Sequence, residues 1–181
     1  MQTYIGFLRG VNVGGHRPVK MEALRQVLEG LGLQGVTTYV QSGNLVFRSG
    51  TADPASLTTE VEAALEAAFG FSIPVMLHRP GPLREFLEAN PFADRLNQEG
   101  NRMYYVLWKS DPDASLEKRL RDGDYPGQQW HLGSLGLYLW CGEGYGNARL
   151  DNNRIELMAE AQTTTRNHKT LSRMLDLTKM L

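Results

Sequence analysis

Apolar positions in the first 80 residues follow two spacings in turn. Crowded aromatic and branched side chains favour strands, whereas apolar residues three and four positions apart favour helices. The predicted elements are a strand at 3–9, a helix at 20–31, strands at 36–41 and 44–48, a helix at 53–69 and a strand at 73–78. Gly32 and Gly70 are placed to end the helices, and Ser42 with Gly43 suits a two-residue hairpin turn.

The rest of the chain repeats this order. A linking helix at 82–89 and a polar connection at 93–101 precede a strand at 102–109, a helix at 113–122, a hairpin of strands at 130–132 and 135–141, a helix at 153–161, a strand at 163–165 and a helix from 167. Each half then has the ferredoxin-like order of strand, helix, two strands, helix and strand. We expect an α+β protein of two tandem ferredoxin-like halves, residues 1–80 and 102–181, with a linking segment at 81–101 and a C-terminal helix.

The two halves differ in the connection after their first strand. The opening strands begin 100 residues apart, at 3 and 103, but the hairpin turns lie 91 apart, at 42 and 133. Most of the additional residues of the first half fall in the segment GVNVGGHRPV at 10–19, which has neither helical nor strand periodicity. A loop longer than its connection requires is more often functional than other segments.

This loop combines flexible backbone with positive charge. Gly10, Gly14 and Gly15 allow backbone amides to turn toward one point. The cationic or titratable side chains beside them are Arg9, His16, Arg17 and Lys20. Such a surface suits a phosphate or carboxylate, especially where the next helix directs its N-terminus at it. The alternative is a glycine-tolerant turn with solvated charges, and the segment matches neither the P-loop nor the dinucleotide-binding fingerprint.

Two further segments carry polar side chains that are candidates for the same site. YVQSGNLVF places Gln41, Ser42 and Asn44 at the hairpin tip, although these side chains also suit a turn that satisfies its own backbone. TTTRN places Arg166 and Asn167 where a strand gives way to a helix, with Asn167 as the helix cap. Arg166 and Lys169 put positive charge at the start of this helix, where it opposes the helix dipole. A bound anion or an acidic partner therefore explains these two residues better than helix stability does. The alternative is an ordinary capped helix.

Composition and charge narrow the function classes. The 181 residues are 41% hydrophobic and 22% charged, as in globular proteins, and the net charge of −1 argues against a protein that binds nucleic acid over its whole surface. Residues 1–25 and 163–181 each carry four cations and one acid, or +3, which leaves −7 for the remainder. No apolar stretch is long enough to span a membrane, and the single cysteine, Cys141, favours a cytoplasmic protein without disulfides.

Known catalytic and metal-binding motifs are missing from the sequence. The four histidines lack metal-ligand spacing, Cys141 sits in an apolar strand where an inert thiol is expected, and no serine-nucleophile motif occurs. The sequence therefore indicates no metal and no cofactor, and it leaves open whether the protein is an enzyme. If it is one, His16 is the candidate acid or base, because imidazole titrates near neutral pH.

Aromatic side chains on the strands of the second half suggest another function. Tyr104 and Trp108 share one parity along their strand, as do Tyr138 and Trp140 along theirs. Exposed aromatic rings on a sheet can stack the bases of single-stranded nucleic acid. Packing against helices or against the other half explains these residues better, because the RNA-recognition consensus is absent.

The chain resembles a known family in three segments. In order they read LRGVNVGGH, YVQSGNLVF and TTTRN, and together they resemble the signature of the bacterial domain-of-unknown-function family 1697 over nearly the whole chain. The resemblance implies a small cytoplasmic bacterial α+β protein without a settled role. The matching positions are Arg9, Gly10, Asn12, Gly14, Gly15, Lys20, Gln41, Ser42, Gly43, Asn44, Arg166 and Asn167, and none brings a catalytic role with it. The family has tryptophan after the third segment, where this chain has His168.

We therefore expect a protein that binds a phosphate-bearing or other anionic small molecule. The expected ligand-binding residues are Arg9, Gly10, Asn12, Gly14, Gly15, Lys20, Gln41, Ser42, Asn44, Arg166 and Asn167. This expectation requires the first loop and the Arg166 segment to meet. Two alternatives stay open: single-stranded nucleic-acid binding through an aromatic sheet face, and a protein-interaction module in which an open sheet docks a partner or a second copy.

Overall fold

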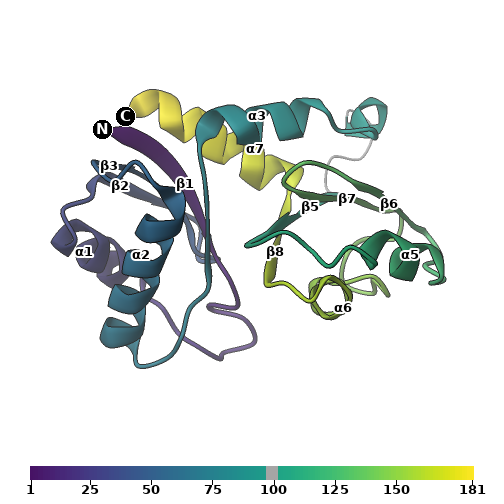
Figure 1. Ribbon diagram of the computed structural model, residues 1–181, viewed down its shortest axis with the longest axis horizontal. Helices are drawn as coiled ribbons and strands as arrows, with labels where there is room; N and C mark the ends of the chain where they lie inside the picture. The colour runs from purple at the N-terminus through teal and green to yellow at the C-terminus, as the bar shows by residue number, and fades with distance from the viewer. Residues whose placement is uncertain (97–101) are drawn as a thin grey trace. The chain divides into compact units, whose positions relative to one another are not determined.

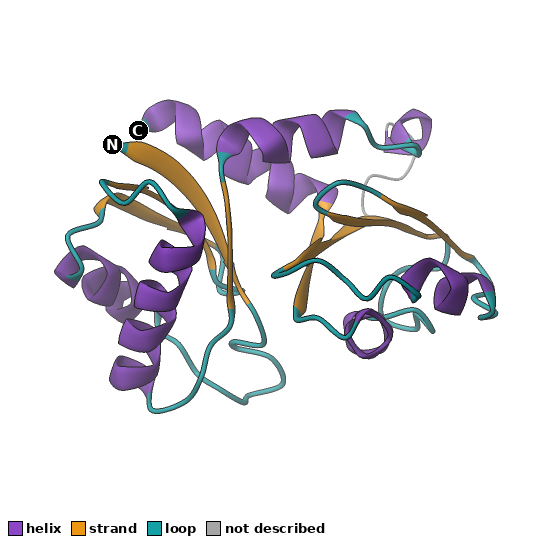
Figure 2. Ribbon diagram, in the orientation of Figure 1, coloured by secondary structure: helices purple, strands orange, loops and turns teal. Residues whose placement is uncertain are grey.

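The computed structural model describes residues 1–96 and 102–181, and the described chain forms two compact units (Figure 1). The first contains Met1–Leu83 and Arg173–Leu181, and the second contains Arg84–Ser172. Each unit holds one four-stranded antiparallel sheet with helices, and the two halves run through similar elements (Figure 2). The expected α+β class is confirmed, and the division into residues 1–80, 81–101 and 102–181 stays a prediction.

The first unit is built around the sheet β2-β3-β1-β4, in which every neighbouring pair is antiparallel. Its elements are β1 (Gln2–Leu8), α1 (Met21–Gly30), β2 (Gln34–Tyr39), β3 (Asn44–Ser49), α2 (Pro54–Phe69) and β4 (Val75–His78), followed by the start of α3 (Pro80–Glu88). Tyr4 pairs with Phe47, and Leu8 pairs with Val75, so these side chains share the face of the sheet that packs against α1 and α2. Every element predicted for this half is present.

Local signals set the ends of α2. The carboxylate of Asp53 accepts hydrogen bonds from the backbone N–H groups of Ala55 and Ser56, at 3.3 and 2.9 Å, and Pro54 occupies the first turn. Gly70 ends the helix in the left-handed conformation, with a φ of 79°. The predicted cap and stop are confirmed, because both act within a few residues of the helix end.

The second unit repeats the element order around the sheet β6-β7-β5-β8. Its elements are the end of α3, η1 (Ala93–Arg95), β5 (Met103–Trp108), α5 (Leu116–Arg121), β6 (Gln128–Leu132), β7 (Gly136–Cys141), α6 (Asn152–Ala159), β8 (Thr163–Asn167) and the start of α7 (His168–Leu177). Helices α5 and α6 cover one face of this sheet, over Val106, Leu137 and Leu139 (Figure 1). The final helix η3 (Thr178–Met180) belongs to the first unit and contacts β1.

The connection between β2 and β3 differs from the prediction. Tyr39 pairs with Asn44, so the hairpin has a four-residue connection, 40–43, in place of the two-residue turn expected at Ser42 and Gly43. Val40 and Gly43 take positive φ angles of 51° and 73° there. The wider turn lets the hairpin tip reach the loop after β1, as described below.

Other predicted boundaries also differ from the structure: β6 begins at Gln128 and not at 130, and β4 begins at Val75 and not at 73. Helix α5 starts at Leu116 and not at 113, because the carboxylate of Asp113 accepts hydrogen bonds from the backbone N–H and the hydroxyl of Ser115 and holds a turn before the helix. Strand β8 continues to Asn167, because pairing with β5 extends that far. Of the polar connection expected at 93–101, residues 93–95 form η1, and 97–101 lie outside the described residues.

The aromatic side chains of the second sheet do not share one exposed face. The register of β5 against β7 puts Tyr104 and Trp108 on the face covered by α5 and α6, and Tyr138 and Trp140 on the opposite face. Tyr138 is 2% exposed and stacks on Phe86 of α3 with 4.5 Å between ring centroids. The packing interpretation is confirmed. Within the described residues, this sheet has no exposed stacking surface of the kind that the nucleic-acid alternative requires.

The helices of the described chain are short. α2 has 16 residues, and α1 and α7 have 10 each. No helix in the described ranges combines the length and the apolar character needed to cross a membrane.

Candidate functional site

The loop between β1 and α1 has an unusual backbone. Its positive-φ residues, with angles from 50° to 78°, are Gly10, Asn12, Gly14, Gly15 and Arg17. Of the four non-glycine residues with positive φ in the described chain, three lie in this loop or in the hairpin connection 40–43. Left-handed backbone costs a residue with a Cβ atom about 1–2 kcal/mol, so other contacts must hold the loop in this shape.

Asn12 supplies those contacts. Its Nδ2 donates to the carbonyl oxygens of Val19 and Gln41, at 2.9 and 2.7 Å, and its Oδ1 accepts from the backbone N–H of Val19 at 2.8 Å. Its backbone N–H donates to the carbonyl of Arg17 at 3.1 Å. These bonds close the loop on itself and tie it to the hairpin tip. The structure therefore brings together two of the three predicted segments, at 10–20 and 41–44.

Gly43 lets the hairpin tip approach the loop closely. Its carbonyl accepts a hydrogen bond from the backbone N–H of Leu8 at 2.8 Å. A Cβ atom on Gly43 would lie 2.7 Å from the Cβ of Leu8 and 2.9 Å from a methyl of Val11. Only glycine fits this contact, so the glycine of the second segment is explained by the junction with the first.

Asn44 supports the hairpin from inside. It is fully buried, and its Nδ2 donates to the carbonyl of Tyr39 and to the hydroxyl of Ser42, both at 2.9 Å. These are the contacts that the turn interpretation predicts for Asn44. Gln41 and Ser42 are exposed at the tip.

Positive side chains and a helix end surround this loop–hairpin junction. Lys20 is exposed at the N-cap position of α1, and its side chain makes no capping hydrogen bond. The guanidinium of Arg17 lies 5.7 Å from the ring centroid of Phe71, and Arg9 is half-buried at the end of β1. His16 is exposed at the loop tip. No acidic residue occurs between Arg9 and Lys20, so the loop itself carries only positive side chains beside the exposed His16.

The third predicted segment belongs to the second unit. Nη1 of Arg166 donates to the hydroxyl of Thr164 and the carbonyl of Thr165, both at 2.8 Å, and burial lowers the pKa of Arg166 to about 10. Oδ1 of Asn167 accepts from the backbone N–H of Thr170 at 2.9 Å, which confirms the predicted helix cap. That Arg166 and Asn167 share a site with the first loop stays a prediction.

Sequence reasoning missed a chain of polar side chains in the second unit. Nδ2 of Asn90 donates to the hydroxyl of Tyr105 at 3.1 Å, this hydroxyl lies 2.8 Å from Nδ1 of His168, and Nε2 of His168 lies 3.2 Å from the hydroxyl of Ser172. Because the Tyr105 oxygen accepts from Asn90, its proton points to His168, whose own proton is then on Nε2. Burial lowers the pKa of His168, which agrees with this neutral form. No sequence signal predicts these hydrogen bonds, because the bonded residues lie up to 63 positions apart.

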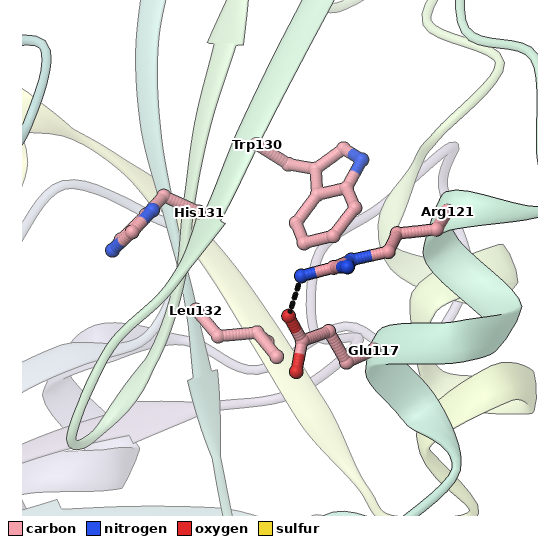
Figure 3. Close-up of a pocket in the computed structure, with 5 residues that line it drawn as sticks. All are labelled: Glu117, Arg121, Trp130, His131 and Leu132. Atoms are coloured by element: carbon pink, nitrogen blue, oxygen red, sulfur yellow. Dashed lines mark hydrogen bonds and ion pairs between the residues drawn. The ribbon is translucent and has the colours of Figure 1, made fainter.

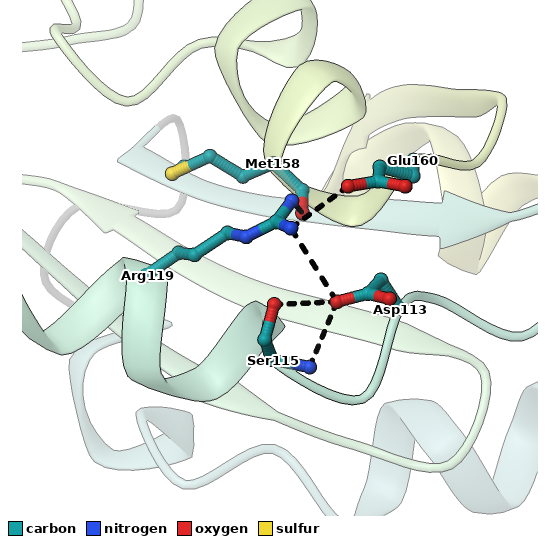
Figure 4. Close-up of polar contacts among 5 residues, drawn as sticks. All are labelled: Asp113, Ser115, Arg119, Met158 and Glu160. Carbon is teal, nitrogen blue, oxygen red and sulfur yellow. Dashed lines mark hydrogen bonds and ion pairs between the residues drawn. The ribbon is translucent and has the colours of Figure 1, made fainter.

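A second polar cluster joins α5 to α6 (Figure 4). Nη1 of Arg119 donates to the carbonyl of Met158, and Nη2 pairs with the carboxylate of Glu160, both at 2.8 Å. Asp113 lies 3.6 Å from the same guanidinium, and hydrogen bonds from Ser115 hold the pKa of that carboxyl below its usual value. The charges of this cluster are paired with one another, so we assign it to holding the two helices together.

The remaining candidate chemistry is structural. Cys141 is 1% exposed in β7, and burial raises the pKa of its thiol to about 11, so the expected inert thiol is confirmed. Among the residues that the structure describes, no three His, Cys, Asp or Glu side chains are grouped so as to hold a metal ion.

Comparison with known proteins identifies a family and a solved structure of similar fold. The model of a family described as "Protein of unknown function (DUF1697)" matches residues 1–138, a range that includes the first two of the three sequence segments. No curated protein matches the chain. A solved structure of the conserved bacterial protein SP0830 from Streptococcus pneumoniae is similar to this chain with a TM-score of 0.77 and 24% identity, over 97% of each chain. This likeness concerns the fold.

Proposed function

The chain belongs to the DUF1697 family, as its three segments predicted, and we propose that it binds a phosphate-bearing or other anionic small molecule at the loop between β1 and α1. The observation that carries the proposal is the Asn12 side chain, which joins the glycine-rich loop to the hairpin tip. A loop held in this way presents its backbone amides in a fixed arrangement before any ligand arrives. Preorganised amides bind anions without a further ordering cost.

The backbone of the loop supports this chemistry. Gly14 and Gly15 are consecutive residues with positive φ, and both are exposed. Residues in such conformations turn successive N–H groups toward one side, where they surround an anion. A Cβ atom at Gly15 would meet nothing within 4 Å, so packing does not require glycine there. The backbone conformation does, because Gly14 and Gly15 lie at the centre of a turn in which the N–H of His16 donates to the carbonyl of Val13 at 3.0 Å.

The charges around the loop support the same ligand class. Lys20 stands where α1 begins, so its ammonium group adds to the positive end of the helix dipole. A cation at this position is unfavourable for the isolated helix, and a bound anion would remove that cost. Arg9 would add a planar fork of donors, which matches two oxygens of a phosphate or carboxylate.

Arg166 and Asn167 are proposed as further ligand-binding residues from the other basic end of the chain. If the protein catalyses a reaction on its ligand, His16 is the proposed acid or base, because it is an exposed imidazole at the loop tip. Neither assignment is needed for anion binding at the loop itself.

The direct test is thermal unfolding with inorganic phosphate, pyrophosphate and nucleotides. A ligand that binds only the folded state stabilises it, by about 2.7 kcal/mol at a concentration 100 times Kd, so the melting temperature should rise with ligand concentration. Lys20→Gln should reduce the rise. The matched control is Lys118→Gln, an exposed lysine of α5 in the second unit, which should keep the full rise. Equal shifts in both variants, or none in the wild type, would contradict the proposal.

Two finer statements about the molecule are also proposals. Each half is a ferredoxin-like unit, which is supported by the element order and by the strand orders β2-β3-β1-β4 and β6-β7-β5-β8. The protein is cytoplasmic, which is supported by a lone, buried cysteine.

A further inference from the structure

One edge of the second sheet lacks the usual protection against other strands. β6 is an edge strand whose one neighbour among the described residues is β7. It contains no Asp, Glu, Lys or Arg and no proline, and all five residues pair with β7 in unbroken register. Edge strands normally carry a charge, a proline or a bulge, or are very short, because an open backbone edge recruits other strands.

The other edge strands of the described chain carry such features. In β2 the register shifts between Gln34 and Thr37. β4 has four residues and follows Pro74, and β8 contains Arg166. β6 stands apart from all three, which indicates that its edge is kept open for pairing.

The outward backbone groups of β6 can be identified from the bonds at its two ends. The N–H of Gly133 donates to the carbonyl of Gly136, and the carbonyl of Gly127 accepts from Gly142, so odd-numbered residues direct their backbone at β7. Antiparallel pairing alternates, so even-numbered residues direct theirs away. The outward N–H of Gln128 is taken by the carbonyl of Tyr125. The outward groups then left to a new strand are those of Trp130 and Leu132 and the carbonyl of Gln128.

We propose that β6 pairs antiparallel with β6 of a second copy of this chain, about a two-fold axis at Trp130. Trp130 would exchange both backbone hydrogen bonds with the partner's Trp130, and the N–H of Leu132 would donate to the partner's Gln128. In this arrangement the outward groups of Trp130, Leu132 and the Gln128 carbonyl form hydrogen bonds with the partner. The N–H of Gln128 keeps its hydrogen bond to Tyr125. On the exposed face Gln129 would lie opposite the partner's His131, and these two polar side chains can hydrogen-bond.

The pocket beside this edge carries one acid and one base (Figure 3). It is lined by Glu117 and Arg121 of α5 and by Trp130, His131 and Leu132 of β6. Glu117 and Arg121 form an exposed ion pair next to the Trp130 ring, while His131 points to the other side of the strand. Because the acid and the base are already paired, this side of the edge carries no excess of one charge.

The test is the mass in solution. Light scattering should give a dimer of 2 × 20.3 = 40.6 kDa for the wild type and 20.3 kDa for Gln129→Lys, because a lysine on the exposed face introduces charge at the pairing edge. Gln162→Lys, at an exposed glutamine of the same unit, is the matched control and should stay dimeric. A wild type that is monomeric at every soluble concentration would overturn the proposal and leave the edge to an extended segment of another protein.

Cross-linking tests the register independently of variant stability. In the proposed pairing positions 129 and 131 face each other at a separation of about 4.5 Å between Cα atoms, within the range for a disulfide. The double variant Gln129→Cys, His131→Cys should form disulfide-linked dimers on oxidation, whereas the buried Cys141 of the wild type should form none. A dimer that does not cross-link in the double variant would overturn the register, and with it the two-fold axis at Trp130.

Discussion

Asn12 combines a strained backbone with three side-chain hydrogen bonds. Its φ is 56°, and its amide reaches both the far end of its own loop and the hairpin tip. From the sequence, this residue is a candidate ligand. In the structure its side chain is fully engaged with the backbone, so its part in the proposed site is to hold other groups in position.

Two substitutions separate the bonds of Asn12 from its strain. Asn12→Gly removes the hydrogen bonds but accepts the positive φ, and should lower the free energy of unfolding by about 1–3 kcal/mol. Asn12→Ala should lose about 1 kcal/mol more, because alanine disfavours left-handed backbone. Urea unfolding measures both. Equal stability of the two variants would show that the loop does not hold position 12 in this conformation.

His78 should make stability depend on pH. Burial lowers its pKa from 6.5 to about 4, and its Nε2 is buried without a hydrogen-bond partner in the described part of the chain. The unfolded chain protonates His78 more readily than the folded chain does. The free energy of unfolding should therefore be highest above pH 6.5 and fall as the pH drops through 6.5 toward about 4. His78→Phe, beside the ring of Phe7, should flatten the fall measured by urea unfolding at several pH values.

The control for His78 is another histidine. His16→Gln removes an exposed imidazole and shows whether the loss of any histidine changes the pH dependence. If the unfolding free energy of His78→Phe depends on pH as in the wild type, other groups cause the dependence. His168 is one such group, because burial lowers its pKa as well.

At the scale of elements, the hairpin tip depends on one close contact. Gly43→Ala would place a methyl within 2.9 Å of Leu8 and Val11 at a φ of 73°. We expect a loss of about 2–4 kcal/mol, since overpacking adds to backbone strain. Gly15→Ala is the matched control, with a φ of 78° and nothing within 4 Å, and should cost about 1 kcal/mol. Urea unfolding that gave equal losses would contradict the contact.

Local signals made most elements predictable. The cap at Asp53, the stop at Gly70 and the cap at Asn167 each act within a few residues, so they can be read from the sequence. The four-residue hairpin could not be predicted, because its shape depends on contacts of Gly43 with Leu8 and Val11 far away in the chain. The aromatic faces could not be assigned either, since the parity of one strand does not reveal its register with the next.

In the whole molecule, two similar sheets differ in the connection after their first strand. Twelve residues (9–20) join β1 to α1, against seven (109–115) between β5 and α5, and the structure joins the longer loop to the hairpin that the sequence also singled out. The register of β1 with β3 pairs Phe7 with Asn44 and so sets the hairpin tip beside this loop, and the sequence does not reveal that register. Asn12 makes the connection, and only the folded chain reveals it.

Amide chemical shifts during a pyrophosphate titration test anion binding at this junction residue by residue. We expect saturable shifts concentrated in residues 10–20 and 40–44, reduced in Lys20→Gln and kept in Lys118→Gln. Shifts that do not saturate, or that fall elsewhere and leave these residues unmoved, would contradict it.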